Sequence, residues 1–345
     1  MSVKYLEWGS SGEVVVLLHG IGECSEVWCS IATKLAEHGY HVFALDLRGH
    51  GQTTWSSSQL YTAQSMATDL KDIFLELDLY RSKCALVGVD IGAAVAAEFA
   101  CLYPRLVAVL ACIDYDAVSK DSRLSYCKVQ AASNVLDYES ATALLTSPLL
   151  KDQQRVKASA EKVVPLMFTQ EGKALGLKPK MDPKFFFSAS MASLGHSLAS
   201  VKCSLLVLHS FGKDTLERMR LLLESTSASF VRVEKSSGYA LSDSPFEVYS
   251  ALKKVLGKCN AFVDEEPHSR TPEALGLRPL PQFGSLEEAF KALGPRNIPN
   301  REEIQAELDK LRDEEGECVS EDDNLNNAHT TSLSNNPSDY FGMIG

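Results

Sequence analysis

The stretch LVGVDIGAAVAAEFA, from Leu86 to Ala100, contains one aspartate at the point where an apolar strand gives way to a helix. Its first three residues are typical of a strand end, and its last eight are rich in strong helix formers. Asp90 is flanked by Gly88 and Gly92, and small flanking residues are what a tight strand-to-helix turn needs. The pattern predicts that Asp90 stands exposed at the start of the helix. Taken alone, it favours helix capping as much as a chemical role.

Strand-like and helix-like segments alternate on both sides of this turn. Segments that are apolar throughout are typical of strands buried on both faces. Their alternation with helices predicts an α/β protein with a mostly parallel sheet covered by helices on both faces. The clearest such segments are VVVLL (14–18), HVFAL (41–45), LVAVLACI (106–113) and SLLVLHS (204–210).

The chain of 345 residues is expected to have four parts. The alternating pattern assigns residues 1–116 and 201–258 to one α/β core. Residues 117–200 interrupt it with a helical and irregular pattern that contains no convincing strand, which predicts a helical lid over the site. Residues 259–315 carry helix-start and helix-stop signals and predict an acidic helical extension. Residues 316–345 are polar and rich in Asn, Ser and Asp, and are expected to be a disordered tail.

The negative charge lies in the last part of the chain. Residues 259–345 hold 18 acidic and 7 basic residues, which accounts for the whole formal net charge of −11. Such a segment repels nucleic acid and anionic membranes, so neither is expected as a partner. Narrow apolar stripes in the predicted helices fit docking on a protein partner, or packing on the chain's own core.

Cysteine usage and hydropathy indicate a cytoplasmic protein. The nine cysteines are scattered without C-x-x-C pairs, which favours reduced thiols and argues against a zinc site. No apolar run is long enough to span a bilayer, and no signal peptide is recognisable at the N-terminus.

Five motifs occur in the order and spacing of the α/β-hydrolase superfamily: LLHGIGECSEVW, LAEHGYHVFALDLRGHGQT, GVDIGAAVAAEFACLYP, LLVLHSFGKD and SSGYALSDSPFEV. The aspartate in G-x-D-x-G resembles the branch that contains epoxide hydrolases and haloalkane dehalogenases. That resemblance implies that Asp90 is a nucleophile which forms an ester with a small apolar electrophile, such as an epoxide, a halide or an ester. It implies no cofactor.

The resemblance also implies the other parts of the site. The backbone N–H groups of Ile21 and Ile91 correspond to the donors that stabilise an oxyanion. Asp214, after the late strand, matches the acid that orients a catalytic histidine. Some relatives place that acid after an earlier strand, where this chain has Asp114 and Asp116.

The chain departs from the family at the catalytic histidine, because the expected Gly-His pair reads Gly238-Tyr239. A phenol with a pKa near 10 is a poor base for activating water at neutral pH. His196 and His209 are alternative bases. The sequence therefore leaves two functions open: an Asp-nucleophile hydrolase with Tyr239 in the site, or a non-catalytic protein that binds a ligand or a partner.

Epoxide hydrolases also use lid tyrosines to polarise the epoxide oxygen. Tyr126 and Tyr138 lie in the predicted lid. No motif connects either residue to that role, so both are predicted to be packing aromatics.

Overall fold

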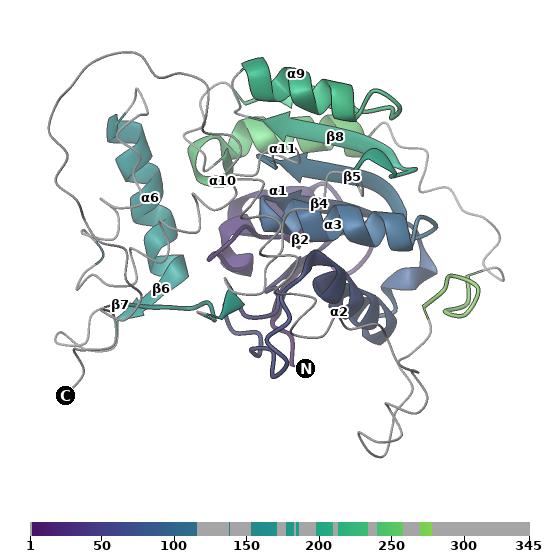
Figure 1. Ribbon diagram of the computed structural model, residues 1–345, viewed down its shortest axis with the longest axis horizontal. Helices are drawn as coiled ribbons and strands as arrows, with labels where there is room; N and C mark the ends of the chain where they lie inside the picture. The colour runs from purple at the N-terminus through teal and green to yellow at the C-terminus, as the bar shows by residue number, and fades with distance from the viewer. Residues whose placement is uncertain are drawn as a thin grey trace, which may run out of the picture. The chain divides into compact units, whose positions relative to one another are not determined.

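A seven-stranded sheet forms the centre of the computed structural model (Figure 1), in the order β1-β3-β2-β4-β5-β8-β9. Its strands are β1 (Tyr5–Trp8), β2 (Val14–Leu18), β3 (His41–Leu45), β4 (Cys84–Val89), β5 (Val107–Ile113), β8 (Ser204–His209) and β9 (Ser229–Arg232). The structure describes residues 2–115, 138, 153–170, 177–182, 184–185, 198–209, 213–233, 240–257 and 270–277.

All neighbouring strands of this sheet run parallel except β1, which pairs antiparallel with β3. The predicted α/β class with a mostly parallel sheet is confirmed. Strand β1 was not predicted. It is a four-residue edge strand without a fully buried residue, so it lacks the continuous apolar run that reveals the central strands.

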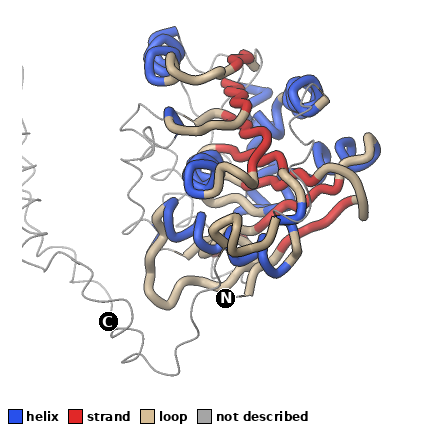
Figure 2. Tube along the Cα trace, turned by 90° about the vertical axis from the view of Figure 1, so that its right-hand side faces the viewer, coloured by secondary structure: helices blue, strands red, loops and turns tan. Residues whose placement is uncertain are grey.

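Each central strand divides its side chains between two helical layers. In β2, Val14, Val16 and Leu18 belong to the core cluster under α2 and α3. Val15 and Leu17 belong to the cluster under α1 and α11. Successive side chains of a strand point to opposite faces, so both faces must be apolar when both are covered. Figure 2 shows helices on both sides of the sheet.

The two helical layers cover opposite faces of the sheet. One layer holds α1 (Cys29–Glu37) and α11 (Pro245–Leu256), and the other holds α2 (Ala63–Glu76), α3 (Ile91–Leu102) and α9 (Lys213–Leu222). The core also contains the short helices η1 (Ser25–Trp28), η2 (Leu79–Arg81) and α10 (Ala240–Asp243).

The described part of the predicted lid includes a helix and a pair of antiparallel strands. Helix α6 (Gln153–Met167) leads into β6 (Phe168–Gln170), which pairs antiparallel with β7 (Leu177–Pro179). The expectation that this region has no strand is therefore wrong. Each of these strands has three residues, which is too short to produce a recognisable alternation.

Polar contacts connect this region to the core near the loop after β3. The amide of Asp182 donates to the Gly49 carbonyl at 2.8 Å, and the Tyr61 hydroxyl donates to the Asp182 carboxylate. The Phe185 ring packs against Tyr61, with ring centroids 5.1 Å apart. The loop after β3 thus joins the region of α6 to the sheet.

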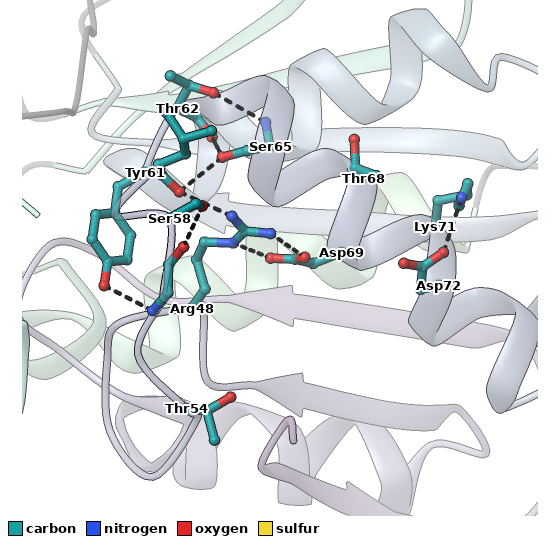
Figure 3. A network of polar contacts seen from close by, with 12 residues as sticks. Arg48, Thr54, Ser58, Tyr61, Thr62, Ser65, Thr68, Asp69, Lys71 and Asp72 are labelled. Carbon is teal, nitrogen blue, oxygen red and sulfur yellow. Dashed lines mark hydrogen bonds and ion pairs between the residues drawn. The ribbon is translucent and has the colours of Figure 1, made fainter. Parts of the chain in front are cut away.

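An ion pair fixes the same loop to α2 (Figure 3). The Arg48 guanidinium binds the Asp69 carboxylate through two nitrogens and donates to the Leu60 carbonyl at 2.9 Å. The Thr62 hydroxyl oxygen caps α2 by accepting from the Ser65 amide at 3.1 Å. Together these contacts position the chain between β3 and α2.

Residues 270–277 of the predicted extension pack on the core. Arg270 is 5% exposed and donates to the backbone carbonyls of Tyr80 and Arg105 at 3.2 and 3.3 Å. Arg105 in turn donates to the Ala274 carbonyl at 3.0 Å, and Leu277 is fully buried. This described piece therefore docks on the chain's own core.

Two glycines allow α3 to approach the ends of β2 and β4. A Cβ atom on Gly88 would lie 2.3 Å from the amide nitrogen of Ala93. A Cβ atom on Gly92 would lie 2.4 Å from the carbonyl oxygen of Leu18 and 2.6 Å from that of His19. All three contacts are with backbone, which cannot move aside as a flexible side chain can. The glycines of G-x-D-x-G are therefore steric requirements.

Gly92→Ala should consequently lower the free energy of unfolding by about 3 kcal/mol or more, since overpacking against rigid backbone is costly. Chemical denaturation followed by far-UV circular dichroism measures the change. Gly257→Ala is the matched control: Gly257 has a helical φ of −71°, and its nearest contact is a carbonyl at 3.1 Å. A Gly92→Ala variant as stable as this control would contradict the packing.

Candidate active site

Asp90 lies between β4 and α3 with a backbone φ of 49° and ψ of −116°. Such a conformation is uncommon outside glycine, and strain of this kind gathers at functional positions. The Asp90 carbonyl starts the helix by accepting from the amides of Ala93 and Ala94 at 3.1 and 3.2 Å. Its side chain makes no capping hydrogen bond. The carboxylate therefore does not make the usual N-cap hydrogen bond of α3.

The Asp90 carboxylate faces two backbone amides. The N–H of Ile21 donates to Oδ2 at 3.3 Å, and the N–H of Ile91 also bonds to the carboxylate. Burial raises the pKa of Asp90, the two amides oppose that rise, and the nearby charge of Asp114 adds to it, so that the net shift is upward. The structure thus brings the predicted nucleophile and both predicted oxyanion donors together.

Glu23 is a second carboxyl group at this place, and the sequence analysis missed it. Its Oε2 accepts from the Gly20 amide at 2.9 Å, and its own amide donates to the Gly20 carbonyl at 3.2 Å. Burial raises the pKa of Glu23 from 4.5 to about 7; the Gly20 amide opposes this shift and the charge of Asp90 increases it. The available signal was a glutamate three residues after the glycine in HGIGE.

Gly20 lies between the two carboxyl side chains. A Cβ atom on it would stand 2.9 Å from Oε2 of Glu23 and 3.5 Å from Cβ of Asp90. A side chain at this position would therefore fill the space that the two acids share. Two successive backbone amides bind the two carboxyl groups: the N–H of Gly20 donates to Glu23, and the N–H of Ile21 donates to Asp90.

The two predicted positions for an orienting acid differ in their surroundings. Asp214 is exposed in the first turn of α9. Asp114 follows β5 with a φ of 47°, is half-buried, and acts electrostatically on Asp90. Asp116 lies outside the described residues. The structure therefore couples Asp114, and not the exposed Asp214, to the charge of Asp90.

The remaining predicted or alternative site residues are Tyr239, His196, Tyr126, Tyr138 and His209. Tyr239, His196 and Tyr126 lie outside the described residues. Tyr138 is half-buried and donates to a backbone carbonyl of β6 at 3.4 Å, which agrees with a packing role. His209 is buried as the last residue of β8.

Two buried histidines near the elbow have structural roles. Nδ1 of His19 bonds to the Gly20 carbonyl at 2.7 Å, and its Nε2 accepts from the Leu47 amide at 3.0 Å. Nδ1 of His50 bonds to the Arg48 carbonyl at 3.2 Å, and the two imidazole rings lie 5.1 Å apart. Burial lowers the pKa of both histidines, most strongly that of His50. Both rings are therefore neutral at physiological pH.

We also considered metal binding, a membrane span and a cysteine nucleophile in the part of the chain that the structure describes. It contains no cluster of three His, Cys, Asp or Glu side chains that could hold a metal ion. None of its helices combines the length and apolarity that crossing a bilayer requires. Burial raises the pKa of the Cys24 thiol, next to the site, to about 12, so this cysteine is a poor nucleophile at neutral pH.

The family model described as the alpha/beta hydrolase fold matches residues 13–155, which include the elbow and its flanking strands. The protein has the α/β-hydrolase fold. The resemblance drawn from the five sequence motifs is thereby confirmed, and stretches of epoxide hydrolases are among the sequences similar to this α/β-hydrolase-fold protein.

Three similar proteins illustrate the range of the likeness. Uncharacterized protein Rv2715 of Mycobacterium tuberculosis is 32% identical over 191 residues, which cover 55% of this chain and 47% of that protein. Epoxide hydrolase 4 of Homo sapiens is 38% identical over 115 residues, 32% of this chain and 30% of that protein. Esterase Rv0045c of M. tuberculosis is 30% identical over 113 residues, 33% of this chain and 36% of that protein.

A solved structure of the same esterase, Rv0045c, matches with a TM-score of 0.58 at 20% identity, over 74% of this chain and 89% of that chain. At this identity the match shows the fold alone. The α/β-hydrolase-fold protein spans about half, or less, of the length of these curated relatives.

Asp90→Asn should stabilise the protein at pH 8. The pKa of Asp90 is raised in the folded state, so stability is fully present below the unfolded pKa and is lost as the pH rises through the folded pKa. The asparagine side chain cannot ionise and so avoids this loss. We expect the free energy of unfolding at pH 8 to increase by an amount on the order of 1 kcal/mol. Thermal melting at pH 8 and pH 5 measures it, and the gain should be smaller at pH 5.

Asp78→Asn is the matched control, because Asp78 also has a positive φ, of 56°, and is exposed. A hydrogen bond from Arg81 lowers the pKa of Asp78, so this substitution should not raise the melting temperature at pH 8. An Asp90→Asn variant that is less stable than wild type at pH 8 would contradict the electrostatic account.

Proposed function

We propose that the protein is a hydrolase in which Asp90 attacks a small apolar electrophile, such as an epoxide, an alkyl halide or an ester. The observation that carries this proposal is the Asp90 carboxylate at the elbow, facing the Ile21 amide at 3.3 Å. A carboxylate that is already ionised needs no general base for its own attack on carbon.

The reaction on an epoxide has two stages. In the first, an Asp90 oxygen forms a bond to an epoxide carbon, and the ring C–O bond breaks to give an alkyl ester and a hydroxyl group. In the second, water attacks the ester carbonyl carbon and the diol leaves. The negative oxygen that forms at that carbon is stabilised by the amides of Ile21 and Ile91, which already contact the carboxylate.

The proposal also needs an acid that orients another residue of the site, and the sequence offers Asp114 and Asp214 among the described residues. Asp114 is the better placed of the two described candidates for orienting a site residue, since its charge acts on Asp90. Asp214 would have to act from the exposed first turn of α9. Tyr239 occupies the sequence position of the histidine that relatives use as a base. Likeness to an epoxide hydrolase and to an esterase supports the choice of electrophiles.

A protein that binds a ligand or a partner without catalysis is the second candidate function. The observation that favours it is Tyr239, because a protonated phenol does not activate water well at neutral pH. In that case Asp90 would be a polar anchor of a binding pocket. Covalent chemistry at Asp90 distinguishes the two candidates.

The proposal predicts a transient covalent adduct with a reactive epoxide. We expect the intact mass of the wild-type protein, quenched soon after mixing with styrene oxide, to increase by one epoxide, since ring opening retains every atom of the reagent. Peptide mapping should locate the added mass on Asp90. Asp90→Asn should abolish the adduct, and Asp78→Asn should leave it unchanged.

An adduct that survives in Asp90→Asn would contradict the proposal. The exposed Cys29 is the first alternative target, and mapping separates its peptide from that of Asp90. Failure of the wild-type protein to form an adduct or diol with epoxide, halide and ester probes would leave binding as the function.

A further inference from the structure

Two carboxyl groups that come from different parts of the sequence lie beside Gly20. Asp90 enters from the strand-to-helix elbow, and Glu23 enters from the loop after β2. Both side chains are half-buried, and each accepts a hydrogen bond from one of two successive backbone amides. The side chain of Glu23 folds back on its own turn, because its Oε2 accepts from the Gly20 amide at 2.9 Å. The backbone N–H of Glu23 closes the same turn by donating to the Gly20 carbonyl at 3.2 Å.

We infer that Glu23 is the catalytic residue that activates water to hydrolyse the Asp90 ester, in the role that relatives give to histidine. This inference rests on the proposed function, because it concerns the second stage of that reaction. A base of this kind must lie close to the ester that its water attacks. The two acids are close, because one point, that of a Cβ atom on Gly20, lies 2.9 Å from Oε2 of Glu23 and 3.5 Å from Cβ of Asp90.

The electrostatics of the pair fit a proton carrier. Two carboxyl groups in one poorly solvated place do not both ionise readily, because each negative charge opposes the ionisation of the other. Burial, with the added charge of Asp90, raises the pKa of Glu23 to about 7. The charge of Asp114 acts on Asp90 in turn. A pKa of about 7 allows Glu23 to give and take a proton near neutral pH.

In the first stage, Glu23 acts as an acid. An Asp90 oxygen bonds to the epoxide carbon, the ring C–O bond breaks, and the ring oxygen takes the proton of Glu23. The products are a neutral Asp90 ester that carries a hydroxyl group and a Glu23 carboxylate. Glu23 is a carboxylate after this stage because its proton has gone to the ring oxygen, and the esterification also removes the Asp90 charge that added to the effect of burial on the pKa of Glu23.

In the second stage, Glu23 acts as a base. Water bonds to the ester carbonyl carbon and gives one proton to Glu23, and the carbonyl oxygen becomes negative next to the amides of Ile21 and Ile91. The intermediate then breaks its bond to the alkoxide oxygen, which takes the remaining proton of the added water. The diol leaves, Asp90 is again a carboxylate, and Glu23 is again protonated. One water is consumed for each epoxide.

Neighbouring titratable groups are less suited to this role. Both nitrogens of His19 are held by backbone groups, at 2.7 and 3.0 Å. The pKa of His50 is lowered well below its usual value by burial, and its ring packs edge-on against Phe185 at 4.8 Å. Burial raises the pKa of the Cys24 thiol to about 12. Among the residues that the structure describes, Glu23 therefore fits this role better than His19, His50 or Cys24.

The experiment measures formation and decay of the Asp90 ester after rapid mixing with substoichiometric styrene oxide, by intact mass. Glu23→Gln keeps an oxygen to accept from the Gly20 amide but cannot take a proton from water. We expect this variant to form the adduct on Asp90 and to lose it at least about 100-fold more slowly than wild type. Glu26→Gln, which changes an exposed glutamate of η1, should decay like wild type.

The pH dependence of ester decay in the wild-type protein gives a second readout that needs no variant. The rate should rise with pH and level off as Glu23 ionises, with a midpoint between 4.5 and about 7, because the Asp90 charge is absent from the ester. Decay at the wild-type rate in Glu23→Gln, or a rate independent of pH over that range, would overturn the inference and leave Asp90 a nucleophile. Absence of any Asp90 adduct would overturn the proposed function itself, and the inference with it.

Discussion

The close approach of α3 to the ends of β2 and β4 is the constraint on which the site depends. At Gly92 the helix passes so near the carbonyls of Leu18 and His19 that there is no room for a side chain. This contact forces the chain through a sharp turn, and Asp90 takes its positive φ there. It also places the start of α3 beside the loop after β2. The amides of both segments therefore meet at the Asp90 carboxylate, although Ile21 and Asp90 are 69 positions apart.

The same geometry makes the site electrostatically costly. Half-buried carboxyl groups lose water, and backbone amides return only part of that hydration. The amides of Ile21 and Ile91 bond to Asp90, and the amide of Gly20 bonds to Glu23, yet the pKa of each acid is raised. The rest of the fold must offset this cost. The two continuous apolar layers around the central strands provide that stability. Acids held in this way are suited to exchanging a proton near neutral pH.

Sequence reasoning predicted the features that depend on local pattern. The elbow and the central strands each carry a strong local signal, and the structure has all of them. Strand β1 and the hairpin of β6 and β7 were missed because short strands with few buried residues have no clear period. Glu23 was missed for a different reason. Its position looks like that of a loop glutamate, and its importance arises only when folding brings Asp90 beside Gly20.

The most direct test of the account is a single turnover in water enriched in oxygen-18, with the protein in excess over styrene oxide. Attack of water on an Asp90 ester must leave an oxygen-18 atom in the Asp90 carboxylate and send one of its original oxygens into the diol. We therefore predict that the peptide containing Asp90 becomes heavier by one isotope exchange, and that the diol from this first turnover is unlabelled. A labelled diol together with an unlabelled peptide would show that water attacks the epoxide directly, and would contradict the role of Asp90 as a nucleophile.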